Sequence, residues 1–206
     1  MERFLGLTHR LRPIPVLLLT ALLFLQVKCT STGTQTVDSV SAPHLDEQAL
    51  ARSIHTYVNR TRTERGLPSL RWNTALARIA RDHSAAMASQ NFFGHVNQQG
   101  QDPTARARQA GFECMKQEGD RVYTGVAENL YMTTQYSRWR DTVDPDGERT
   151  RTYDWKSIDQ IARETVDGWM NSPGHRANLL NPIYDSQGIG VAVAADRDIF
   201  ITENFC

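Results

Sequence analysis

The sequence predicts an α+β fold in which helices cover a mostly antiparallel sheet. Apolar side chains recur every three or four residues in stretches that begin after Leu45, Asn73 and Ser157, which is typical of helices with one buried face. Near the end of the chain, two apolar stretches at 188–194 and 199–205 flank a turn and predict a β-hairpin. The length of 206 residues suits one such domain with an N-terminal appendage.

The N-terminal appendage has the features of an export signal. Basic residues precede an apolar run from Ile14 to Val27, which is shorter than the roughly 20 residues that a transmembrane helix needs. We therefore assign residues 1–29 to a signal peptide or an N-terminal membrane segment, with lipid modification of Cys29 as a second alternative. A secreted or extracytoplasmic protein is expected, which the N-terminal segment could anchor to the membrane.

Composition sets the boundaries of the domain and excludes one class of partner. Residues 30–44 are rich in Ser and Thr and predict a flexible linker, so the folded domain is expected at 45–206. Lys and Arg number 23, as do Asp and Glu, which gives a formal net charge of zero. Without a basic surplus, no nucleic-acid partner is expected, and the membrane is expected to be contacted only through the N-terminal segment.

Residues that favour helix ends flank the first two helices. Asp46 and Asn73 are suitable N-caps, and Gly66 stands where a helix C′ glycine belongs. His83 falls on the apolar stripe of the second helix, where a lone histidine is usually a satisfied core residue. The stripes contain Leu50, Ile54 and Val58 in the first helix and Leu76, Ile79, Ala80 and Met87 in the second.

The middle of the chain carries a histidine and a glutamate in apolar surroundings. In the segment 92–95, Gly94 allows the backbone to turn so that His95 can leave the core. Asp102-Pro103 then indicates the start of a short helix. Residues 122–129 are expected to form a short buried segment, and its Glu128 is expected to have a partner because a buried carboxylate is costly alone.

Two later stretches complete the candidate site. Residues 133–156 are longer than most loops, which predicts a surface insertion or a functional flap. The Pro-Gly pair at 173–174 is expected to stop the preceding helix, and a short turn then presents His175. Together with His95 and Glu128, this gives two imidazoles and one carboxylate from three distant parts of the chain.

Cys114 and Cys206 stand alone in the predicted domain. Their spacing is not that of a zinc site, which needs close pairs of ligands. They are either two unrelated buried thiols or a disulfide that ties the last strand to the middle of the chain. A disulfide would require an oxidising compartment, which an export signal would provide.

Two imidazoles and a carboxylate can act chemically or only structurally. His95 and His175 would suit a divalent metal such as zinc, with Glu128 as the general base of a hydrolysis. Alternatively, the three side chains only form hydrogen bonds that hold three loops together. The sequence lacks the zincin pattern of two histidines one helical turn apart, which favours the second alternative.

Six motifs, in order, resemble the CAP superfamily, also called SCP/TAPS, in its prokaryotic secreted branch. They are Asn59-Arg60 with Gly66-Leu67-Pro68-Ser69-Leu70, Trp72-Asn73, Phe93-Gly94-His95, Glu128-Asn129-Leu130, Trp169 to Arg176, and Gly188-Ile189-Gly190-Val191. The resemblance covers residues 45–206 and implies a three-layer α-β-α sandwich with a central antiparallel sheet. It also implies a cleft lined by two histidines and two acidic residues, through whose histidines some members bind a divalent ion.

The match to the family's site is incomplete. His95, Glu128 and His175 match three of its positions, and the second acidic position falls near Ser172. Ala127 stands where the family usually has glycine, so a positive φ there would strain the backbone or move Glu128.

These observations favour a binding module over an enzyme. The resemblance implies a small apolar ligand or an envelope or extracellular protein as partner, bound in a cleft to which Asn129, Ser172 and Arg176 contribute. The alternative is a divalent-metal-dependent hydrolase of peptides or envelope polymers that uses the two histidines and Glu128. A third hypothesis is a purely structural envelope protein whose cleft is sealed by residues 133–156.

Overall fold

A computed structural model describes residues 36–38 and 42–206 of the chain. The predictions for residues 1–29, including Cys29, lie outside the described residues, as does most of the predicted linker at 30–44. None of the helices in the described part is long and apolar enough to cross a membrane.

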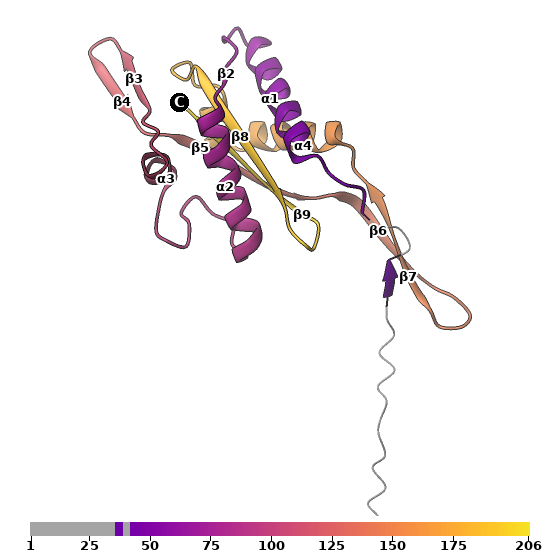
Figure 1. The fold of residues 1–206 in the computed structure, drawn as a ribbon. Helices are drawn as coiled ribbons and strands as arrows, with labels where there is room; N and C mark the ends of the chain where they lie inside the picture. The colour runs from indigo at the N-terminus through magenta and orange to yellow at the C-terminus, as the bar shows by residue number, and fades with distance from the viewer. Residues whose placement is uncertain (1–35, 39–41) are drawn as a thin grey trace, which may run out of the picture. The chain divides into compact units, whose positions relative to one another are not determined.

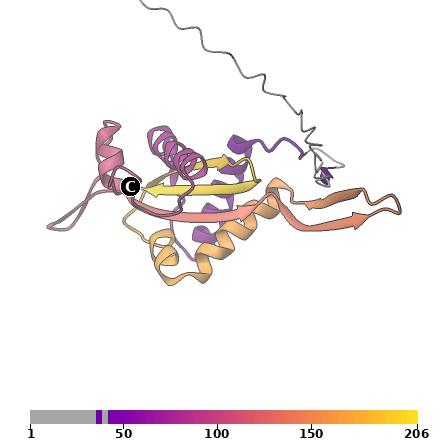
Figure 2. The same ribbon diagram turned by 90° about the horizontal axis from the view of Figure 1, so that it is seen from below.

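The fold is a three-layer sandwich around a four-stranded sheet, as the sequence predicted (Figures 1 and 2). The strand order is β2-β8-β9-β5, with β8, β9 and β5 antiparallel and β2 joined in parallel to β8. These strands are β2 (Arg71–Trp72), β5 (Ala127–Thr134), β8 (Ser186–Val193) and β9 (Asp198–Phe205).

Helices cover both faces of this sheet. One face carries α2 (Thr74–Gln90), with α3 (Pro103–Gln109) beside it, and the other carries α1 (Glu47–Thr63) and α4 (Ile158–Asn171). The short helix α5 (Pro173–Leu179) follows α4 and contacts β5. A turn had been predicted in place of α5; Pro173 instead occupies its first turn, where the missing N–H is not needed.

The predicted helix caps are present. Asp46 accepts from the backbone N–H of Ala49 at 2.9 Å, and the side chains of Asn73 and Asp102 cap α2 and α3 in the same way. Gly66 has a φ of 76°, and the N–H groups of Gly66 and Leu67 bond back to the end of α1. These bonds form the C-terminal motif that favours glycine.

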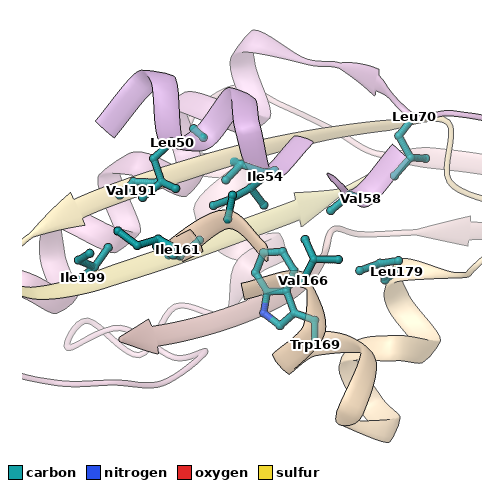
Figure 3. Packing of buried hydrophobic residues seen from close by; sticks show 14 of the residues in the cluster. Leu50, Ile54, Val58, Leu70, Ile161, Val166, Trp169, Leu179, Val191 and Ile199 are labelled. Atoms are coloured by element: carbon teal, nitrogen blue, oxygen red, sulfur yellow. The ribbon is translucent and has the colours of Figure 1, made fainter. Parts of the chain in front are cut away.

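The main core lies between the sheet and the α1–α4 layer (Figure 3). Leu50, Ile54 and Val58 of α1 meet Ile161 and Trp169 of α4, and all five side chains are fully buried. Burial of each such side chain contributes roughly 1.5–3 kcal/mol. The predicted stripes of α1 and α4 therefore account for this layer.

The other face brings α2 unusually close to β8. Gly188 and Gly190 point toward α2, and a Cβ on Gly190 would lie 1.9 Å from the backbone nitrogen of Arg81. The hydroxyl of Ser84 donates to the carbonyl of Gly190 at 3.1 Å. Glycine at these positions lets a helix pack directly on strand backbone.

The outer edge of β5 is covered by side chains from α4 and α5. Trp169 donates from its indole nitrogen to the carbonyl of Leu130 at 3.0 Å, and Asn178 donates to the carbonyl of Glu128 at 3.2 Å. Both carbonyls are thus satisfied although β5 is the last strand of the sheet. The bond from Asn178 also fixes the position of Glu128 relative to α5.

Cys114 and Cys206 form a disulfide, with an S–S distance of 2.08 Å. The alternative of two unrelated thiols is therefore wrong. The bond closes a loop across 92 positions, and cross-links of this kind typically contribute about 2–4 kcal/mol. It ties the end of β9 to the residue before β3 (Met115–Glu118), which pairs with β4 (Arg121–Thr124).

One prediction for the middle of the chain needs correction. The segment 122–129 was expected to be buried, but Val122 and Tyr123 lie on the exposed strand β4 and burial begins only at Val126. At Gly94 the chain bends as expected, with a φ that is not positive, and the side chain of His95 is half exposed.

The insertion at 133–156 is a β-hairpin and not a flap over the histidines. It consists of β6 (Tyr136–Val143) and β7 (Arg149–Trp155), with β1 (Thr36–Asp38) paired to β7. The hairpin continues from the far end of β5 (Figure 1), and Glu128 lies near that strand's beginning. About 20 Å of strand separates the two ends, so the hairpin does not support the hypothesis of a sealed cleft.

Candidate functional site

Glu128 is buried at the beginning of β5, and both of its carboxylate oxygens are engaged. Its side chain is 1% exposed. Oε2 accepts from Nη2 of Arg106 at 2.5 Å, and Oε1 accepts from Nδ1 of His95 at 2.9 Å. The expected partner of this carboxylate is therefore a pair of side chains, one from α3 and one from the loop after α2.

Arg106 is the functional residue that sequence reasoning missed. Besides Glu128, its guanidinium donates to the carbonyls of His95 (2.6 Å) and Gln101 (2.9 Å). It thus fixes both ends of the loop that carries His95. The sequence did indicate that Glu128 needs a partner, but α3 contains two arginines, and only Arg106 faces inward while Arg108 is exposed.

His83 is buried, as predicted, and it also holds the histidine loop. Its Nε2 donates to the carbonyl of Gly94 at 3.0 Å and lies 4.0 Å from Oε1 of Glu128. Burial is the main cause that lowers the pKa of His83, so the ring is neutral at neutral pH. A core position in the middle of α2 therefore becomes part of the scaffold around Glu128.

His95 and His175 lie side by side, with ring centroids 6.5 Å apart. Because a carboxylate can only accept, Nδ1 of His95 carries the proton, which leaves Nε2 of the neutral ring as an acceptor. The side chain of His95 is half exposed. Loss of hydration, followed by the nearby charge of His95, lowers the pKa of His175. The ring of His175 is therefore mainly neutral near neutral pH, and it stands beside that of His95.

A buried amide holds α5, and hence His175, against the sheet. Asn129 donates to the carbonyl of His175 at 3.1 Å and accepts from Asn178 at 3.0 Å. Asn129 also donates to the carboxylate of Glu203 at 3.4 Å. Complete burial raises the pKa of Glu203 well above its usual value. Asn129 thus positions the backbone of His175 and does not itself reach the surface.

Ser172 and Arg176 lie close to His175 in the sequence, at the start of α5. Ser172 joins α4 to α5, and its side chain makes no capping hydrogen bond. Arg176 is exposed and donates to the carbonyl of Met170 at 3.1 Å. The φ of Ala127 is not positive, since Asn91 and Arg197 are the non-glycine residues with positive φ in the described part of the chain. The expected backbone strain at Ala127 is therefore absent.

The imidazole pair suits a weakly held divalent ion better than a closed metal cage. The described residues contain no group of three or more His, Cys, Asp or Glu side chains placed to hold a metal. Two imidazoles on one zinc ion would have centroids roughly 5–5.5 Å apart, given Zn–N distances of about 2 Å. The observed 6.5 Å requires a shift of about 1 Å. Glu128 would then orient His95 from behind, as carboxylates commonly do in metal sites.

We expect His175 to titrate below the ordinary histidine value of 6.5, because burial and the charge of His95 both favour the neutral ring. An NMR titration of the His175 ring protons measures this directly. In a His95→Ala variant, the pKa of His175 should rise toward 6.5 because one of the two causes is removed. A titration at or above 6.5 in the unaltered protein would contradict the assigned environment.

The three-layer sandwich and the paired histidines at the edge of its sheet define a known class of domain. A family model described as the cysteine-rich secretory protein family, CAP, matches residues 55–205. The chain belongs to this family. The resemblance found in the motifs is thereby confirmed over most of the predicted domain.

Individual relatives agree with this assignment. The Bacillus subtilis protein named "Uncharacterized protein YkwD" is 29% identical over 163 residues, which is 79% of this chain and 50% of that protein. An extracellular protein containing a SCP domain from Bacillus anthracis has a similar structure, with a TM-score of 0.54 and 24% identity over 80% of this chain and 44% of that one. An outer surface protein from Borrelia burgdorferi also has a similar structure, with a TM-score of 0.53 and 16% identity over 80% of this chain and 98% of that one.

These likenesses establish the fold and not the activity. This chain spans half the length of the Bacillus subtilis relative and 44% of the Bacillus anthracis protein. The Bacillus anthracis and Borrelia burgdorferi proteins are less than 25% identical to this chain, so their similarity does not extend to ligands. Function must therefore be argued from the site.

Proposed function

We propose that the protein is an extracytoplasmic binding module that contacts an envelope or extracellular protein through the face around His95 and His175. The supporting observation is the state of Glu128. Its side chain is 1% exposed, and both oxygens already accept hydrogen bonds. A general base must reach the proton that it removes. Glu128 is therefore better suited to fixing His95 than to catalysis, which favours binding over hydrolysis.

Exposed apolar side chains on the loop of His95 and on β5 support a protein partner. Phe93, Val96 and Met132 are each about half exposed. Met132 is the cross-strand neighbour of Phe200, whose ring lies 6.4 Å from that of Phe93. Pockets for small ligands bury 70–90% of the ligand, whereas exposed apolar patches commonly mark protein interfaces. A small apolar ligand remains the other outcome of the test.

An extracytoplasmic location is part of this proposal. The apolar run at 14–27 has the pattern of an export signal, and a disulfide such as Cys114–Cys206 persists in oxidising compartments. Two of the relatives carry names that place them outside the cell or on its outer surface. Anchoring through the N-terminal segment belongs to the same proposal and is tested by fractionation.

Site-specific photo-crosslinking tests the proposed interface. A crosslinking amino acid at Met132 is expected to give one dominant protein adduct from the extracytoplasmic fraction of the source cells. The adduct should be competed by excess unlabelled protein and weakened by Phe93→Ser, because that variant removes apolar contact area. The matched control is a crosslinker at Val143, which is similarly exposed but lies on β6.

The outcomes separate the candidate partners. Equal labelling from Met132 and Val143 would refute a specific interface on this face. Co-purifying lipid that is lost in Phe93→Ser, without a protein adduct, would instead identify a small apolar ligand.

A second candidate is a divalent-metal site, favoured by the fixed tautomer of His95. Nε2 of His95 and the neutral ring of His175 would hold the ion, which would supply Lewis acidity for a hydrolytic reaction. Calorimetric titration with zinc should then show one site that is lost in His95→Ala/His175→Ala and kept in His44→Ala, whose histidine is exposed elsewhere. Equal zinc binding by both variants would exclude the site.

A further inference from the structure

We propose that a cavity between α2 and α3 binds a neutral sugar or polyol. The cavity measures about 410 Å³ and is lined by α2, α3 and the loop 97–101. This volume is within the range of small-molecule sites. The proposal does not rest on the proposed function, because the exposed imidazoles of His95 and His175 are not part of the cavity lining.

Two buried side chains that line the cavity each keep one unpaired polar atom. Nε2 of His83 donates to Gly94, so the neutral ring leaves Nδ1 as an acceptor. Nε of Arg106 is a donor, and neither atom has a partner among the described residues. Both side chains are more than nine-tenths buried. A hydroxyl group can both donate and accept, so a ligand with several hydroxyls matches a lining that holds an acceptor on one side chain and a donor on the other.

Amide side chains at the rim extend the same polarity. Asn97 donates to Gln101 at 2.9 Å, and Gln101 donates to Gln109 at 2.7 Å. This chain of amides ends at the side-chain nitrogen of Gln109, which is exposed and has further donor capacity. Planar amides offer a donor and an acceptor together, so they suit neighbouring hydroxyl groups. The lining is thus built for several hydroxyls and not for one water alone.

The charges around the cavity favour a neutral occupant. Arg106 is compensated by Glu128 at 2.5 Å, and Arg78 lies 4.0 Å from Asp82. No uncompensated charge among the described lining residues is left to attract an anion or a cation. Ile79 adds an apolar surface against which the carbon skeleton of a sugar ring can pack. A free neutral sugar or polyol therefore fits better than a phosphorylated one.

NMR titration of the full-length chain with N-acetylglucosamine, glucose and sorbitol tests the proposal. At least one of these probes is expected to cause saturable shifts of the side-chain amide signals of Gln101 and Gln109. Gln109→Ala should weaken that affinity about tenfold, since loss of one hydrogen bond to a ligand is commonly worth about that factor. Gln117→Ala is the matched control, because Gln117 lies on β3 outside the cavity.

Each result decides the proposal. Absence of saturable shifts with all three probes would show that the cavity holds water only and would overturn it. Equal affinity in Gln109→Ala and Gln117→Ala would also overturn it, as would displacement of the probe by inorganic phosphate. His175→Ala should leave sugar binding unchanged, so failure of the proposed protein interface and failure of the sugar site can be told apart.

Discussion

Replacing Arg106 with leucine is expected to destabilise the fold by about 3–5 kcal/mol, which is typical of removing one partner from a buried ion pair. Glu128 would keep a charge at a position where its side chain is 1% exposed. The carbonyls of His95 and Gln101 would lose their donor at the same time. We therefore expect the loop that carries His95 to detach from α3 before the rest of the domain unfolds.

Urea unfolding at pH 7 measures the loss, and Arg108→Leu is the matched control. Arg108 lies two positions further along α3 and is exposed, so its replacement should change the free energy of unfolding by less than about 0.5 kcal/mol. Adding Glu128→Leu to Arg106→Leu should recover much of the stability, because the unpaired charge is then gone. Similar stability of the Arg106 and Arg108 variants would show that the ion pair does not hold the site.

The replacement of Gly190 by alanine is expected to cost about 3 kcal/mol, the upper end of the usual range for small-to-large changes in a packed core. An added Cβ would lie 1.9 Å from the backbone nitrogen of Arg81 and 2.2 Å from the carbonyl carbon of Ala80. Helix backbone cannot move aside as a flexible side chain can. The whole of α2 would have to shift away from β8, and His83 would move with it because it lies in the same helix.

Thermal unfolding compared with Gly174→Ala tests this packing. Gly174 is exposed on α5, and an added Cβ there would meet nothing within 4 Å. That variant should be neutral or slightly stabilising, since alanine favours helix more than glycine does. If the two alanine variants unfold at the same temperature, the direct contact between α2 and β8 is wrong.

Local signals in the sequence predicted most of the fold. Asp46 and Asn73 were predicted as N-caps, and both side chains accept the capping bond. Apolar periodicity placed the buried stripes of α1 and α4, and the terminal hairpin was expected where β8 and β9 lie. These features depend on neighbours a few residues away, so a single sequence contains the information that sets them.

The remaining features depend on contacts between distant segments. The sequence predicted that Glu128 needs a partner, but it could not distinguish Arg106 from Arg108, because the choice depends on how α3 is rotated against β5. The strands of 133–156 pair mainly with each other and were not recognised among their many charges. Similarly, Pro173 was interpreted as the end of one helix, although proline is equally suited to begin the next.

The bonds from Trp169 and Asn178 to β5 have a consequence for self-association in crowded surroundings. A strand at the border of a sheet normally offers free carbonyls onto which a foreign strand can add, which is a route to fibrils and strand exchange. Here the carbonyls of Leu130 and Glu128 are already occupied by an indole and an amide. The border formed by β5 is thus protected at these two carbonyls against growth by addition of other chains.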